Sequence, residues 1–286
     1  MTPPPSPRPG NAPPCETGTA PARFVRHGAA EGGAEGGAPL VRAVPLEAPV
    51  SVEVNGIGLA VMMATPLALE DFAVGFARSE GLLGEMPELE GVDVHEVPAG
   101  HVVRLWLRGA GADRIAERAR SRLTESACGL CGLASLEAAM RPLPLLVRPL
   151  QVRPDALFHA LAALPDHQAL GRGTGATHAA ALCDAGGAIR LVREDVGRHN
   201  ALDKLVGAAL RGGIDTAAHF ALVTSRLSFE LVDKAVRAPL GALAAISAPT
   251  ALALERAAAA GLPVIALARA DAALWAEVPS RFPDRG

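Results

Sequence analysis

Apolar and polar residues begin to alternate regularly near residue 48. Within 50–54 every second residue is valine, an Asn-Gly pair follows at 55–56, and a second apolar run comes after it. An Asn-Gly pair between two such runs is a strong signal for a β-hairpin. Thr65-Pro66 then supplies a capping residue and a proline for a first helical turn. We therefore predict a hairpin and a following helix that extends to about residue 83.

A second strand-and-helix pattern leads to a pair of cysteines. Residues 101–109 alternate like a strand, and a helical pattern begins at Asp113. Cys128 and Cys131 follow this helix at once, with a glycine after each and another short helical stretch beyond them. The pair is therefore expected on a loop between helices, where a thiol can be reached.

The second half of the chain alternates continuous apolar runs with amphipathic stretches. Residues 154–164 read as a helix and 177–195 as another hairpin. Helices and strands then alternate over 199–210, 219–225, 228–238, 242–247, 250–260 and 264–269. This order is typical of a parallel βαβαβ sheet covered by helices. We predict an α/β fold with a mixed sheet whose parallel half is covered by helices, together with a smaller N-terminal α+β part.

Polar residues follow the predicted parallel strands where each strand ends. These residues are Ser225, Arg226, Ser228, Ser247, Thr250 and Arg269. Ligands of open α/β sheets bind beyond the carboxyl ends of the strands, and helix N-termini there favour anions. The edge therefore suits phosphate or another anion, although Ser228 and Thr250 could equally serve only as helix caps.

Composition narrows the function classes. The 286 residues are 50% hydrophobic and 20% charged, which is the balance of a soluble globular protein. Aromatic residues make up 3%, tyrosine is absent and the net charge is −3, so a nucleic-acid-binding role has little support. No apolar run without a charge reaches the length of about 18 residues that a membrane span needs. We expect no nucleic-acid partner and no membrane insertion.

The N-terminus is rich in proline, alanine and glycine. It lacks the apolar core of a secretory signal, so we expect a cytoplasmic protein in a reducing compartment. The predicted organisation is a disordered arm over 1–43, an N-terminal α+β part over 44–150 that carries the cysteine loop, and a C-terminal α/β part over 151–286. In such a compartment the four cysteines suit chemistry or metal binding better than a disulfide framework.

Spacing alone leaves three roles open for Cys128 and Cys131. A zinc site needs about four ligands, and only Cys183 with His178 or His199 could complete one, because no second CxxC is present. A thioredoxin-type redox pair would follow a strand, whereas a helix precedes this pair. A third role is the carriage of sulfur or an acyl group on an accessible thiolate.

The stretch 191–207 concentrates charged residues at a strand-to-helix junction. Asp203 and Lys204 are explained adequately by a solvated helix face. A Glu-Asp pair and an Arg-His-Asn run, which ends in His199 and Asn200, are explained less well in this way. Sites in α/β proteins are built at strand ends of this kind, so His199 and Asn200 are candidate site residues.

Six segments in order make the chain resemble the formate dehydrogenase accessory sulfurtransferases, the FdhD family. The segments are 60–83, 125–132, 174–183, 193–207, 225–238 and 247–255, and the resemblance covers roughly 44–270. It implies a cytidine-deaminase-like fold without the zinc motif, and a homodimer. It also implies a sulfurtransferase that takes persulfide sulfur from a cysteine desulfurase. The sulfur then passes to the Mo-bis(molybdopterin guanine dinucleotide) cofactor of formate dehydrogenase.

The resemblance also implies roles for individual residues. Cys128 would carry the persulfide and Cys131 would assist its relay or release, with no tightly held metal. Cofactor binding would involve Arg226, Ser228, His199, Asn200 and the segment Leu267, Ala268, Arg269, Ala270, Asp271 and Ala272. The chain departs from the family pattern at Ser225, where glycine is usual, and after Arg269, where alanines replace a basic residue and a polar tail. The alternative function is a non-catalytic cofactor chaperone whose CxxC is closed by zinc or a disulfide.

Overall fold

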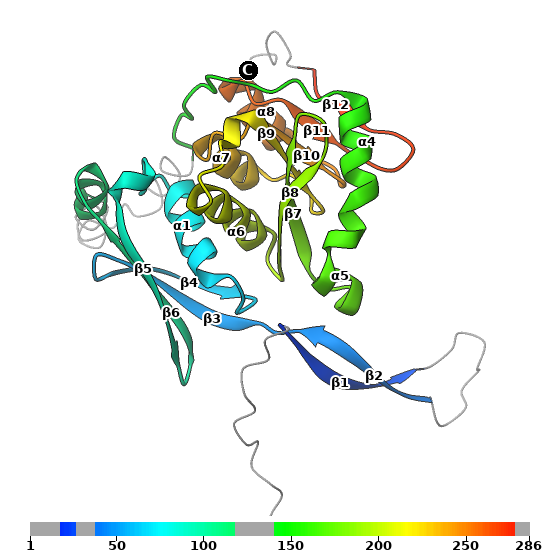
Figure 1. Ribbon diagram of the computed structural model, residues 1–286, viewed down its shortest axis with the longest axis horizontal. Helices are drawn as coiled ribbons and strands as arrows, with labels where there is room; N and C mark the ends of the chain where they lie inside the picture. Colours follow the sequence, from blue (N-terminus) through cyan, green and yellow to red (C-terminus); the bar gives the residue numbers. More distant parts are fainter. Residues whose placement is uncertain (1–17, 27–37, 118–139, 278–286) are drawn as a thin grey trace, which may run out of the picture.

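The computed structural model describes residues 18–26, 38–117 and 140–277. Figure 1 shows three parts: a helix-covered sheet formed by the C-terminal half, a smaller sheet from the N-terminal half, and a hairpin that projects from the body. Within these ranges no helix has the length and apolar character required to cross a membrane.

The projecting hairpin consists of β1 (Thr19–Arg26) and β2 (Ala38–Pro45). The two strands are antiparallel, with Thr19 opposite Pro45 and Arg26 opposite Ala38. Our prediction of disorder over 1–43 therefore does not hold for these segments. Each holds a short β-prone run, around Phe24 in β1 and Leu40-Val41 in β2, which the surrounding proline and glycine obscured.

The N-terminal sheet has the strand order β4-β3-β6-β5. Its strands are β3 (Ala48–Val54), β4 (Ile57–Ala64), β5 (Leu89–Val97) and β6 (Gly100–Leu107), with the short 3₁₀ turn η1 (Met86–Glu88) before β5. The predicted Asn-Gly hairpin joins β3 to β4, and both turn residues have positive φ. Helix α1 (Leu69–Ser79) covers one face, where its two phenylalanines and Leu69 join one core with the inward valines of β3.

The C-terminal sheet has the strand order β12-β11-β10-β9-β7-β8. Its strands are β7 (His178–Asp184), β8 (Ile189–Asp195), β9 (His219–Val223), β10 (Ala242–Ala245), β11 (Val264–Ala266) and β12 (Leu274–Trp275). Strands β9, β10 and β11 are parallel, whereas β7 and β8 form an antiparallel hairpin beside β9. The predicted mixed sheet with a parallel half is confirmed.

Helices cover both faces of this sheet. On one face lie α6 (Arg198–Arg211), α7 (Phe229–Arg237) and α8 (Ala251–Ala260). On the other lies α4 (Pro154–Ala163), with η2 (Leu164–His167) at its end and α5 (Ala169–Thr174) beyond it. The turn η3 (Thr216–Ala218) leads into β9. Alanines fill much of the space between strands and helices, as the scarcity of aromatic residues leads us to expect.

The two halves meet where α1 crosses α6, the two central helices in Figure 1. A Cβ on Gly75 would lie 1.7 Å from the carbonyl oxygen of Asp203, and a Cβ on Gly207 would lie 1.8 Å from that of Asp71. The helices therefore touch backbone to backbone, and only glycine permits this approach. This contact fixes the N-terminal sheet against the body that carries the predicted site.

Candidate functional site at the carboxyl edge of the sheet

The carboxyl ends of β8, β9, β10 and β11 form one edge of the C-terminal sheet, which we call the carboxyl edge. Strand β7 begins at this edge because it is antiparallel to β9. The Thr224 N–H donates to the carbonyl oxygen of Ala179 at 3.0 Å, and the Thr224 hydroxyl accepts from the Ala179 N–H at 3.0 Å. These bonds set His178, at the start of β7, close to the loop that follows β9.

Three polar side chains at the first turns of α6 and α7 form a connected group. Nε2 of His199 lies 3.1 Å from Oε2 of Glu230, and the Ser228 hydroxyl donates to the same oxygen at 2.9 Å. Burial and the neighbouring Arg198 lower the pKa of His199, although Glu230 acts in the opposite direction. His199 is therefore held in place and favours its neutral form.

Three arginines at the carboxyl edge, Arg198, Arg226 and Arg269, have no carboxylate partner among the described residues. Arg226 and Arg269 are exposed and Arg198 is partly buried, and none of them forms an ion pair with the described residues. Other partly buried or buried arginines, such as Arg193, Arg211 and Arg256, pair with aspartates. An edge with unpaired guanidinium groups is suited to an anionic ligand.

The predicted segment 267–272 forms a tight turn at the same edge. Leu267 has a φ of 49°, and its N–H donates to the carbonyl oxygen of Ser247. Ala268 is buried and donates to Ala245, while the N–H of Arg269 donates to Ala272. The remaining residues of the segment, Ala270, Asp271 and Ala272, are exposed. The backbone is thus held firmly, and the Arg269 side chain is left free to meet a ligand.

Asn200 faces the interior instead of the edge. It is 2% exposed, and its amide nitrogen donates to the carbonyl oxygen of Met63 at 2.8 Å and to Oδ1 of Asp195 at 3.0 Å. The bond to Met63 joins the two halves, the bond to Asp195 lies within the C-terminal half, and the buried Oδ1 of Asn200 has no hydrogen-bond partner among the described residues. Contact between Asn200 and a cofactor stays a prediction, and its geometry here is that of a structural residue.

Asp195 and Lys204 form the centre of this junction. Nζ of Lys204 lies 2.5 Å from Oδ2 of Asp195 and donates to the Thr65 carbonyl oxygen at 2.8 Å, and both side chains of the pair are fully buried. Thr65 does not cap α1 as we predicted. Its N–H donates to Asp195, and its hydroxyl accepts from the N–H of Val196. The polar groups of Thr65 are thus used at the junction and not to cap the helix. Helix α1 begins at Leu69, after Ala68 in a left-handed backbone conformation.

Cys128 and Cys131 lie outside the described residues. Among the residues considered for a zinc site, the structure describes only Cys183, His178 and His199. Cys183 is fully buried, and burial raises the pKa of its thiol to about 12. It stands five residues along β7 from His178, a separation of about 17 Å at the rise of a β-strand. These two residues cannot bind one metal ion, and the described residues contain no cluster of three side chains placed to hold a metal.

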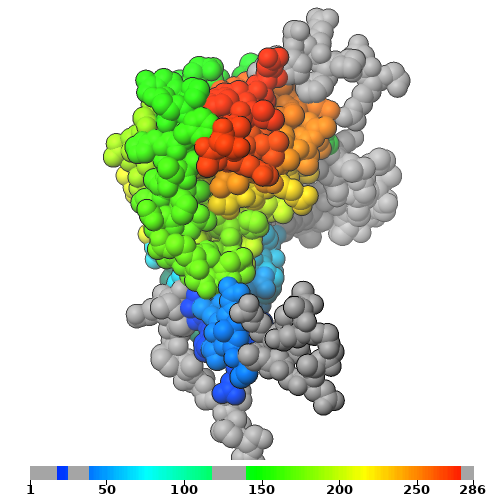
Figure 2. Space-filling model, turned by 90° about the vertical axis from the view of Figure 1, so that its right-hand side faces the viewer, coloured from blue at the N-terminus to red at the C-terminus, as the bar shows by residue number. Residues whose placement is uncertain are grey.

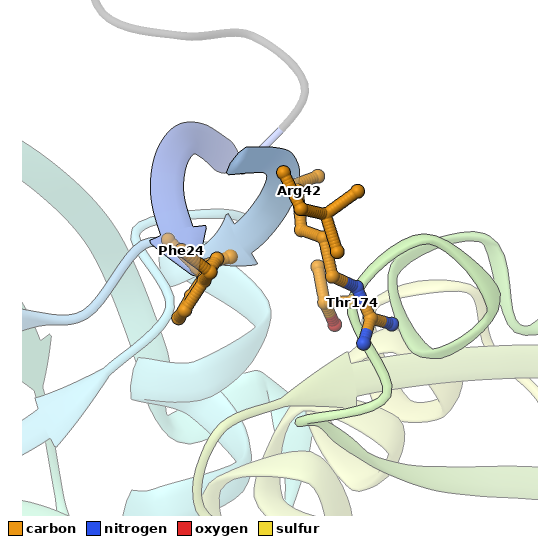
Figure 3. A pocket seen from close by; sticks show the side chains of 6 residues that line it. Phe24, Arg42 and Thr174 are labelled. Carbon is orange, nitrogen blue, oxygen red and sulfur yellow. The ribbon is translucent and has the colours of Figure 1, made fainter. Parts of the chain in front are cut away.

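A cavity of about 560 Å³ lies between the hairpin and the body. It is lined by Phe24, Leu40, Arg42, Ala43, Val44 and Thr174. Figure 3 shows the Arg42 guanidinium directed toward Thr174 with Phe24 across the opening, and Figure 2 shows the hairpin projecting below the body. None of the predicted site residues lines this cavity, although Thr174 precedes the loop that leads to His178.

Sequence reasoning missed two members of the edge. Glu230 was concealed in an amphipathic helix, where an acidic residue in the first turn is ordinarily only a favourable charge. His178 was considered only as a possible zinc ligand. A strand beginning with histidine opposite the Glu-Asp pair is a weak signal, and only the antiparallel pairing of β7 with β8 and β9 brings it to this edge.

Comparison with known proteins gives one consistent result. The model of the FdhD/NarQ family matches residues 45–281. The sulfur carrier protein FdhD of Xanthomonas euvesicatoria pv. vesicatoria is 49% identical over 226 residues, which cover 79% of this chain and 80% of that protein. The protein of the same name from Bordetella petrii is 43% identical over 252 residues, which cover 88% of this chain and 90% of that protein.

A solved structure supports the fold. The crystal structure of a formate dehydrogenase accessory protein from Desulfotalea psychrophila aligns with a TM-score of 0.67 at 21% sequence identity. The alignment covers 91% of this chain and 97% of that one, so the two proteins share their overall architecture.

Proposed function

The chain belongs to the FdhD/NarQ family, and from this premise we propose that it is a sulfur carrier for the Mo-bis(molybdopterin guanine dinucleotide) cofactor. Its thiolate at Cys128 attacks the terminal sulfur of a persulfide on a cysteine desulfurase. The donor S–S bond breaks, the donor cysteine leaves as a thiolate, and Cys128 holds the sulfur as a new persulfide. This terminal sulfur is then delivered to the cofactor, which is the substrate of the transfer.

The carboxyl edge is the observation that supports this cargo. A guanine dinucleotide carries negatively charged phosphates, and Arg226 and Arg269 are exposed there without carboxylate partners among the described residues. The bidentate geometry of arginine is well matched to phosphate oxygens. In this proposal Arg226, Arg269 and Ser228 contact the cargo, and His199 shapes the same surface.

The proposal extends to partners and setting. The protein acts in the cytoplasm as a homodimer, receives sulfur from a cysteine desulfurase and supports formate dehydrogenase. The name of the matched accessory protein is consistent with a role in that system. Cys131 assists the relay or release of the sulfur.

Mass spectrometry of the intact chain tests sulfur carriage. After incubation with a desulfurase and cysteine, the wild-type chain should gain about 32 Da for each sulfur atom bound. Cys128→Ala should lose this adduct, while Cys183→Ala, which removes a buried thiol, should retain it. An adduct that persists on Cys128→Ala overturns the assignment. One equivalent of tightly bound zinc, with Cys128 and Cys131 unreactive, would instead favour a chaperone with a closed CxxC.

A further inference from the structure

Arg198 is partly buried and forms no ion pair with the residues that the structure describes. It is the first residue of α6, and its Nε atom is buried and has no hydrogen-bond partner among the described residues. The other buried cations nearby are all paired, Lys204 with Asp195 and Lys234 with Asp203. Removing a charged N–H from water without a compensating acceptor is costly, and the described residues provide no acceptor for Nε of Arg198.

The carboxylates nearest to Arg198 are already engaged. Asp195 accepts from Lys204 and from the N–H groups of Thr65 and Gly197. Glu230 accepts from Ser228 and lies against His199. Neither carboxylate can turn to Arg198 without leaving buried or paired donors unsatisfied. These two carboxylates therefore do not supply the acceptor that Nε of Arg198 lacks.

Two histidines lie near Arg198. His178 is paired across the β7–β8 ladder with Asp195, three residues before Arg198, and His199 follows Arg198 directly. Burial first and the Arg198 charge second lower the pKa of each histidine. Asp195 acts to raise the pKa of His178. Glu230 acts to raise the pKa of His199, and Lys234 acts to lower it. Both rings are therefore close enough to Arg198 to sense its charge.

We propose that Arg198 binds a phosphate-type oxyanion at the carboxyl edge, between His178 and His199. Its guanidinium supplies a bidentate fork for two anionic oxygens, and the two rings supply additional donors. This assignment rests on the proposed function, because it makes Arg198 a contact for a phosphate group of the dinucleotide. Arg226 and Arg269 would then serve the more exposed parts of the same ligand.

The proposal has a consequence that a simple surface charge would not have. An oxyanion at Arg198 offsets the guanidinium charge that disfavours protonated histidine, so binding should be accompanied by proton uptake at His178 and His199. By linkage, the anion then binds more tightly as the pH falls. A bound anion near an ordinary exposed arginine would show little pH dependence between pH 6 and 8.

Pyrophosphate binding to the full-length chain tests the inference. Titration calorimetry at several pH values should show affinity that rises toward lower pH, and the NMR signals of His178 and His199 should move on addition of pyrophosphate. Arg198→Gln should weaken binding roughly ten- to hundredfold, the range expected for a lost charge-assisted contact. Arg198→Lys keeps the charge without the fork and should be intermediate. Arg190→Gln removes an exposed arginine at the far end of β8 and is the matched control, with affinity unchanged.

Several results would overturn the inference. Unmoved histidine signals in the wild-type chain at saturating pyrophosphate would do so without any variant, as would equal affinities of Arg198→Gln and Arg190→Gln. An adventitious ion at crowded surface arginines would show neither the pH dependence nor the histidine shifts. A chain that carries sulfur on Cys128 but fails these tests loses only this inference. A chain that passes them but forms no persulfide loses the proposed sulfur transfer instead.

Discussion

The junction of the two halves and the carboxyl edge draw on the same short segment, yet they treat charge in opposite ways. At the junction, Asp195 and Lys204 are fully buried and matched to each other. At the edge, Arg198 stands without a partner among the described residues, and Arg226 is exposed. Matched charges within a protein fix its geometry, whereas unmatched ones are available to a ligand. The difference separates the structural residues of a charged motif from its functional candidates.

Helical geometry explains how one helix contributes to both regions. Asn200, Lys204, Gly207 and Arg211 are spaced by three or four residues and all meet the N-terminal half. His199 and Asp203 are one turn apart on the neighbouring face and meet Glu230 and Lys234 of α7. Residues at these spacings share a face of a helix. Adjacent residues such as His199 and Asn200 can therefore belong to different regions.

Loss of the buried ion pair should have the largest effect on stability. Lys204→Met leaves Asp195 buried without its cationic partner and should lower the free energy of unfolding by about 3–5 kcal/mol. Urea unfolding followed by circular dichroism measures the change. Arg190→Gln breaks an exposed pair with Asp184 and should cost less than about 1 kcal/mol. A Lys204→Met chain as stable as Arg190→Gln would remove the distinction between matched interior charges and surface ones.

Widening of the helix crossing should have the next largest effect. Gly207→Ala places a methyl group 1.8 Å from the Asp71 carbonyl oxygen, so α1 and α6 must separate. We expect a loss of about 3 kcal/mol, measured in the same unfolding experiment. Gly173→Ala is the control, because a Cβ there meets nothing within 4 Å. Equal stabilities of the two variants would show that the crossing is not close-packed.

Adjacent residues in α6 offer a sharper comparison. Asn200→Ala removes two buried hydrogen bonds and should lower the free energy of unfolding by about 2 kcal/mol without changing pyrophosphate affinity. His199→Ala should change the free energy of unfolding less and should lower the affinity for pyrophosphate. Unfolding curves and binding titrations of the two variants separate the roles. If Asn200→Ala lowers the pyrophosphate affinity more than His199→Ala does, Asn200 is a binding residue of the carboxyl edge, as the sequence suggested.

The sequence predicted the sheet well because its signals are local. The valine alternation in 50–54, the Asn-Gly turn and the apolar strands of the second half all describe neighbours along the chain. The candidate site could be predicted only to the level of the segment. Thr65 resembled a cap, and Asn200 resembled a site residue, because nothing local reveals that both take part in contacts across 130 residues or more.

The smallest expected effect is on the pKa values of the two histidines. It is also the most direct measure of the charges at the carboxyl edge. The pKa values of His178 and His199 are lowered by burial and then by Arg198. The unfolded chain therefore binds more protons just below pH 6.5, and the folded chain should lose stability as the pH falls through that window. Arg198→Gln should raise both pKa values, whereas Glu230→Gln should lower that of His199 and leave His178 unchanged. NMR titration of the two rings measures both shifts. If Arg198→Gln moves only one ring, Arg198 does not stand between the histidines, and the contrast with the fully matched junction loses its central residue.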